Sequence, residues 1–174
     1  MKKMAPELRI IAVLQFSHRE VDKMPEQETL ERAREDAAEG KAPSTQAGEF
    51  VCEEIEHIRE GKHGARSAKQ AIAIGLSKAR RAGVKLPPPK ASKTSASTRQ
   101  KAMSDSKAAA NRHKPSSKRS RATLNALKKE GKAAASKKAL SKQAHSSASK
   151  GTMKERSAAG KKAAKTRASE ARRK

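Results

Sequence analysis

Aromatic side chains are almost absent from this sequence. It has no Trp and no Tyr, and Phe16 and Phe50 are its only phenylalanines among 174 residues. Aromatic residues bury large areas and dominate the energetics of protein cores. We therefore do not expect one globular domain spanning the whole chain. The same shortage disfavours an aromatic platform on which single-stranded bases could stack.

Cysteines and long apolar runs are also scarce. Cys52 is the one cysteine, so no disulfide can form within the chain, which agrees with a reducing compartment. No stretch approaches the ~20 apolar residues that a membrane-spanning helix needs. The apolar run at 8–16 is interrupted by Arg9 and Gln15, and no signal-peptidase site follows it, which argues against secretion.

Motifs that carry catalysis are missing as well. The sequence contains no glycine-rich nucleotide loop, no zinc-protease helix and no serine-hydrolase turn, so we predict that the protein is not an enzyme and needs no cofactor. Cys52, His57 and His63, with His18 as a fourth candidate, do not have a standard zinc spacing. On one helix Cys52 and His57 would point ~140° apart. We predict no metal site, and a buried, inert Cys52.

Acidic residues nearly disappear after the first third of the chain. Residues 1–60 hold nine basic and fourteen acidic side chains, whereas residues 61–174 hold thirty-three and four, within a total net charge of +24. Such asymmetry is typical of an acidic or neutral head joined to a cationic arm.

The head is predicted to be a small all-α domain. Residues 26–39 follow Pro25, carry acidic residues in their first turn and stop at Gly40, as a surface helix would. The segment 41–45 is expected to be a loop. In residues 48–60 the apolar side chains recur at i, i+4 and i+7, at the positions of Val51, Ile55 and Ile58.

A second amphipathic helix is predicted at residues 67–82. Ser67 and Gln70 form a capping-box pattern at its start, and Gly83 follows its end. The turn between the two helices is short, so 46–86 should form an antiparallel helical hairpin. Residues 87–90, with prolines at 87–89, then act as a stiff linker.

The N-terminal segment 1–45 is expected to be helical. Residues 7–16 contain β-branched side chains, but no second strand is available within the chain, so helix is the default. The alternative is strand pairing with the same segment of another copy. In that case residues 8–16 are the predicted homodimer interface.

Residues 91–174, the basic arm, have the composition of a disordered chain. They hold twenty-five basic and four acidic residues, and mostly Ala and Ser between them. Low hydrophobicity with high charge predicts disorder in the free protein. Ala and Lys favour helix once a polyanion removes the repulsion, so partial helices are expected on binding, near 121–147 and 154–172.

Two resemblances accompany these patterns. Lys62-His63-Gly64, followed by KQAIAIGLSKA from Lys69 to Ala79, resembles a family of small, basic bacterial proteins of uncharacterised function, over roughly 49–83. The basic arm resembles the lysine- and alanine-rich tails of linker-histone-like bacterial proteins. These resemblances imply a bacterial protein of the cytoplasm, located at the nucleoid, and carry over no catalytic role.

The predicted function is DNA binding without sequence preference, by neutralisation of phosphates. The same electrostatics could serve RNA or the ribosome, and a third hypothesis is a protein-interaction head whose partner binds 26–60. The helix at 67–82 could enter a major groove, but phosphate contacts are favoured. The predicted nucleic-acid-binding residues are Arg66, Lys69, Lys78, Arg80, Arg81, Lys85, Lys118, Arg119, Arg121, Lys128, Lys129, Lys137, Lys138, Lys161, Lys162, Lys165, Arg167, Arg172 and Arg173.

Overall fold

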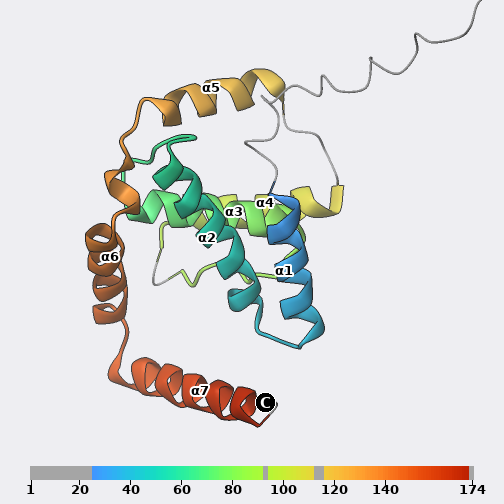
Figure 1. Ribbon diagram of the computed structural model, residues 1–174, viewed down its shortest axis with the longest axis vertical. Helices are drawn as coiled ribbons and strands as arrows, with labels where there is room; N and C mark the ends of the chain where they lie inside the picture. The colour runs from blue at the N-terminus through green and yellow to red at the C-terminus, as the bar shows by residue number, and fades with distance from the viewer. Residues whose placement is uncertain (1–24, 92–93, 112–115, 173–174) are drawn as a thin grey trace, which may run out of the picture. The chain divides into compact units, whose positions relative to one another are not determined.

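A computed structural model describes residues 25–91, 94–111 and 116–172, which are all-helical and contain no strand. Figure 1 shows the elements in chain order: α1 (Gln27–Ala38), α2 (Pro43–Glu60), α3 (Ala68–Arg81), α4 (Ala96–Asn111), α5 (Ser117–Lys128), the 3-10 helix η2 (Lys132–Ala135), α6 (Lys137–Ser149) and α7 (Met153–Ala171). The all-α prediction is confirmed for the described part of the head, residues 25–86. The segment 8–16, with its predicted dimer interface, lies outside the described residues.

Local sequence signals explain where most of the head helices begin and end. Gln70 N–H donates to Ser67 Oγ at 3.2 Å, and Gln70 Oε1 accepts from Arg66 N–H at 2.9 Å, so the predicted cap of α3 is present. Helix α2 starts earlier than predicted, at Pro43. Proline suits the first helical position because its missing N–H would have no partner there. The loop predicted at 41–45 is therefore wrong in its second half.

The chain divides into two compact units, each made of two separate segments. The first unit comprises residues 1–54 and 74–115, and the second comprises 55–73 and 116–174. Both α2 and α3 contribute to each unit. None of the helices in the described part of the chain is long and apolar enough to cross a membrane.

The core of the first unit forms around one aromatic side chain. Phe50 is completely buried, with Ala33, Ala47 and Ala79 beside it. Partly buried apolar side chains surround this cluster: Leu30, Leu76, Val84 and Leu86. Gly75 lets α3 approach α2 closely, since a Cβ at that position would lie 2.7 Å from the Val51 Cα. The small residues in this core therefore allow the helices to pack closely, so that few aromatic side chains are needed to fill it.

The core of the second unit joins α2 and α3 to the basic arm. Ile58, Ala65 and Ala71 pack with Ala134 and Ala135 of η2. The backbone reinforces this contact, because Gly64 N–H donates to the Leu127 carbonyl at 3.0 Å and Ala65 N–H donates to the Gly131 carbonyl at 3.2 Å. A Cβ at Gly64 would clash with the Glu130 carbonyl, so this approach requires glycine.

The disordered arm predicted for 91–174 is not what the structure describes. Helix α4 belongs to the first unit, and η2 lies in the core of the second. Low hydrophobicity and high charge predict disorder, but small residues such as Ala134 and Ala135 allow backbones to come close and hydrogen-bond. The arm helices α5, α6 and α7 overlap the stretches 121–147 and 154–172, for which helix was expected only on binding.

Side-chain caps help to explain why the arm is helical. Ser136 Oγ accepts from Ala139 N–H at 3.2 Å at the start of α6. Before α7, Thr152 N–H donates to Glu155 Oε2 at 3.1 Å and Glu155 N–H donates to Thr152 Oγ1 at 3.2 Å. This reciprocal pair is a capping box, which satisfies two N–H groups at the helix start. The pattern T-x-x-E at 152–155 is a sequence signal for the start of this helix.

Candidate nucleic-acid interface

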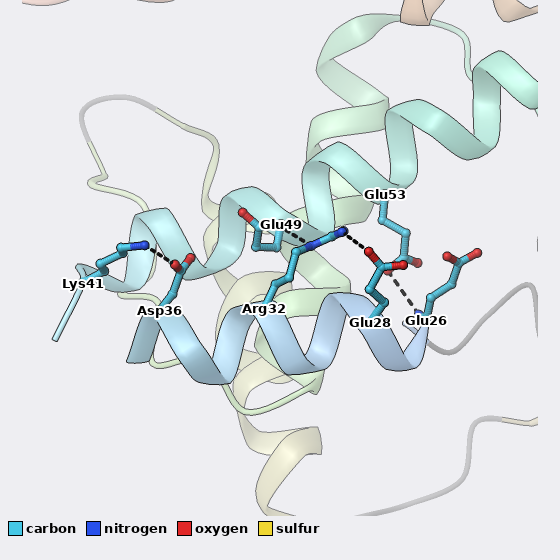
Figure 2. A network of polar contacts seen from close by, with 7 residues as sticks. All are labelled: Glu26, Glu28, Arg32, Asp36, Lys41, Glu49 and Glu53. Carbon is cyan, nitrogen blue, oxygen red and sulfur yellow. Dashed lines mark hydrogen bonds and ion pairs between the residues drawn. The ribbon is translucent and has the colours of Figure 1, made fainter. Parts of the chain in front are cut away.

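Several charged side chains of the first unit form ion pairs and hydrogen bonds within that unit. Figure 2 shows Arg32 between Glu28 on its own helix and Glu49 on α2, with nitrogen–oxygen distances of 2.6 and 2.8 Å. At the start of α1, Glu26 N–H donates to Glu53 Oε2 at 3.2 Å. These contacts hold α1 against α2, so their role is structural.

Lys41 forms ion pairs at the other end of α1. Its Nζ lies 2.8 Å from Asp36 Oδ1 and 3.0 Å from Glu39 Oε2. The hydrogen bond to Asp36, followed by that to Glu39, raises the pKa of Lys41 above its ordinary value. The charge of Lys41 is therefore paired with the carboxylates of Asp36 and Glu39 at the end of α1.

Lys78, a predicted phosphate contact, lies in a buried ion cluster instead. Its Nζ is 3.2 Å from Glu53 Oε1 and 2.9 Å from Glu54 Oε2. The side chains are 11%, 2% and 0% exposed, in the order Lys78, Glu53, Glu54. A charge pair this deep is costly to break because the remaining partner is left unpaired. Lys78 therefore compensates two buried carboxylates and does not face solvent.

The other predicted contacts on α3 are arranged differently. Arg81 Nη2 donates to Asp105 Oδ1 at 2.8 Å, and Ser77 Oγ donates to Asp105 Oδ2 at 2.7 Å. Asp105 is buried on α4, so this contact fixes α4 against α3. Arg80 is half-buried, while Lys69 in the second unit and Lys85 after α3 are exposed.

The predicted contacts of the second unit that lie after residue 116 are exposed. No side chain of α5 or α6 is buried, and those described on α7 are exposed except for half-buried Glu155. Arg173 lies outside the described residues. The exposed predicted contacts here are Lys118, Arg119, Arg121, Lys128, Lys129, Lys137, Lys138, Lys161, Lys162, Lys165, Arg167 and Arg172.

The acidic residues of this region offer little compensation. Residues 116–174 contain nineteen basic and three acidic side chains. Glu130 lies 3.5 Å from Arg66, and Glu155 caps α7. Most of the cationic surface on α5, α6 and α7, the basic helices, is therefore left to attract anions from solution.

Helix α7 places part of its charge on one face. Lys154, Lys161 and Lys165 are separated by seven and four residues, which puts them within about 40° around the axis and spreads them over roughly 17 Å. Among the side chains of α7 that the structure describes, none is buried against a core. A row of exposed cations on a helix is suited to the backbone of a nucleic acid.

A cleft of about 380 Å³ opens beside the turn between α2 and α3. Residues 61–64 form one wall, and Lys128, Glu130 and Lys132 form the other. His63 is buried behind it, its Nδ1 3.2 Å from the Gly64 carbonyl oxygen and its ring edge-on to His57, with centroids 6.2 Å apart. No local pattern predicts this cleft, because the residues of its two walls are more than sixty positions apart in the chain.

Cys52 does not lie where it was predicted. It is exposed on α2, about 200° around the helix from the buried Phe50. The prediction of a buried thiol was wrong because it relied on the general tendency of cysteine and not on its position relative to Phe50.

Comparison with known proteins identifies one similarity. Residues 53–91 match the model of a family of unknown function (DUF6496). The match covers the end of α2, the 61–64 turn and all of α3. Searches of curated proteins and of solved structures found no match. The similarity therefore marks the α2–α3 region and assigns it no activity.

Proposed function

We propose that the protein binds DNA without sequence preference through α5, α6 and α7, as a nucleoid-associated protein. The observation that supports this most is that these helices carry dense positive charge while burying no side chain of α5 or α6. Surface helices ordinarily bury an apolar stripe. On α5 and α6 the large apolar side chains Leu124, Leu127 and Leu140 are only half-buried. Their exposed cations are therefore available to a polyanion.

Counterion release supplies the driving force for this mode of binding. Duplex DNA carries one negative charge per ~1.7 Å, and each neutralised phosphate releases condensed counterions. Because Lys and Arg contacts to phosphates carry no base information, binding is expected to be insensitive to sequence. The buried Lys78 and Arg32 of α1 are paired with carboxylates of the first unit and are expected to contribute little.

The test compares two variants of the full chain with equal loss of charge. One replaces Lys161, Lys162, Lys165 and Arg167 of α7 with Gln, and the control replaces exposed residues of the first unit, Arg34, Arg99, Lys101 and Lys107. Fluorescence anisotropy measures binding to duplex DNA across a salt series. The α7 variant should lose about 3.6 from the slope of log K against log salt, and the control less than about 1.

The outcome separates the competing functions. Equal loss in both variants would mean that total charge attracts DNA and the basic helices are not the interface. Structured RNA should be titrated in parallel. A preference for it of about tenfold or more at matched salt would replace DNA by RNA as the partner.

A further inference from the structure

The cleft beside the 61–64 turn is held open by a rigid frame. Arg59 Nε donates to the Ala135 carbonyl at 3.1 Å, and the buried cluster of Ile58, Ala65 and Ala71 with η2 lies behind the turn. Gly61 adopts a φ of +86°, which favours glycine. These contacts fix both walls, so side chains that line the cleft are held near one another.

The lining is more positive than negative. Lys62, Lys128 and Lys132 are exposed at the cleft, with Glu130 as its one carboxylate. Glu130 is drawn toward Arg66, and Lys62 lies 3.1 Å from Glu60. Within the described chain, Lys128 and Lys132 pair with no carboxylate. The cleft thus holds at least two ammonium groups without a matching anion.

The Lys132 side chain lies across the turn itself. A Cβ at Gly61 would lie 2.5 Å from Lys132 Nζ and 2.6 Å from its Cε. The ammonium therefore lies beside the backbone of the opposite wall, although the Lys132 side chain as a whole is exposed. A ligand in the cleft would meet a positioned charge.

We propose that this cleft binds one phosphate group, held by the ammonium groups of Lys128 and Lys132 with Lys62 at the rim. The proposal rests on the proposed function, in which that phosphate belongs to the DNA backbone. Lysine is a common phosphate ligand and acts as a point charge with several donors. A bound phosphate also links residues 128–132 to the 61–64 turn, so it should stabilise the contact between these two segments.

The first experiment titrates inorganic phosphate into the isotope-labelled full chain at constant ionic strength, observed by amide NMR. The nine glycines provide reporters in a separate spectral region. Gly61, Gly64 and Gly131 should shift saturably, with a Kd on the order of millimolar. Gly40, Gly83 and Gly160 should not. Equal, unsaturable shifts at all glycines would overturn the proposal.

The second experiment tests whether DNA supplies the phosphate. Lys128→Gln with Lys132→Gln is compared with Lys161→Gln with Lys165→Gln, which removes the same charge from α7. At matched salt the cleft pair should weaken DNA binding by about tenfold and the α7 pair by about threefold. The single variant Lys132→Arg, in which Lys128 is unchanged, should keep most of the wild-type affinity, since it keeps the charge.

The two proposals fail in different ways. If both pairs weaken binding equally and phosphate gives no local shift, the cleft site is wrong while DNA binding by the basic helices stands. If phosphate saturates the cleft but the wild-type chain binds no DNA, the proposed function is wrong and free phosphate is the source of the ligand. Circular dichroism and thermal unfolding of each variant confirm that the fold is intact.

Discussion

The two units of this protein contain similar numbers of cations but differ in how many acidic residues accompany them. The first unit has nineteen basic and thirteen acidic residues, and the second has twenty-three and five. In the first, Arg32, Lys41 and Lys78 are engaged by carboxylates of the same unit. In the second, the cations of α5–α7 greatly outnumber the acids. The role of a lysine is therefore set by its neighbours and its burial, because the residue type is the same.

Removal of Lys78 should have the largest effect on stability. Lys78→Ala leaves Glu53 and Glu54 buried without their cation, and loss of one partner of a buried pair costs about 3–5 kcal/mol. Chemical denaturation of the variant measures this loss. Lys69→Ala, an exposed lysine on the same helix, should change stability by less than about 0.5 kcal/mol. Similar values for the two would contradict a structural role for Lys78.

Substitution of Gly75 should come next. Gly75→Ala places a Cβ 2.7 Å from the Val51 Cα and 2.9 Å from the Phe50 carbonyl oxygen, so overpacking should cost about 1–3 kcal/mol. Gly160→Ala on α7 meets nothing within 4 Å and should stabilise its helix by about 0.5–1 kcal/mol. Thermal unfolding compares them. A destabilising Gly160→Ala would show that α7 packs against other atoms.

Loss of the Asp105 contact should have a smaller and more local effect. Asp105→Ala removes the acceptor for Ser77 and Arg81, which should cost about 1–2 kcal/mol because Arg81 is partly exposed. Hydrogen exchange should rise along α4 while α1 stays protected. Ser104→Ala, an exposed neighbour, is the control. Unchanged exchange in α4 would mean that other contacts hold this helix.

Neutralisation of α7 should leave stability almost unchanged. Lys161→Gln with Lys165→Gln removes two exposed cations, so unfolding should shift by less than about 0.5 kcal/mol. The slope of DNA affinity against salt should fall by roughly 1.8. This pattern is the reverse of that for Lys78, where stability changes most. A strongly destabilised double variant would place α7 among the structural elements of the second unit.

Local sequence signals located most helices of the head. The apolar spacing of Val51, Ile55 and Ile58 and the Ser67–Gln70 cap predicted α2 and α3, because both signals depend on residues within two helical turns. Thr152 and Glu155 offered the same kind of signal for α7. The helical content of the basic arm was thus within reach of sequence reasoning, although composition alone indicated disorder.

The candidate interface could be predicted only in part. The excess of Lys and Arg after residue 116 follows from composition. The burial of Lys78 does not follow from composition. It depends on ion pairs with Glu53 and Glu54, which lie on another helix. The 61–64 cleft is similar, because Lys128 and Lys132 reach it through folding of a distant segment.

The sequence by itself determined that the head is helical and that the charge of the chain is divided unevenly, since helix propensity, caps and net charge are local or additive properties. Tertiary structure decided which cations are paired and which are exposed. It also decided that Ala134 and Ala135 belong to a core and that two distant segments share a cleft. The physical reason is distance: ion pairs and packing act over a few ångströms, and only the folded chain brings such residues that close.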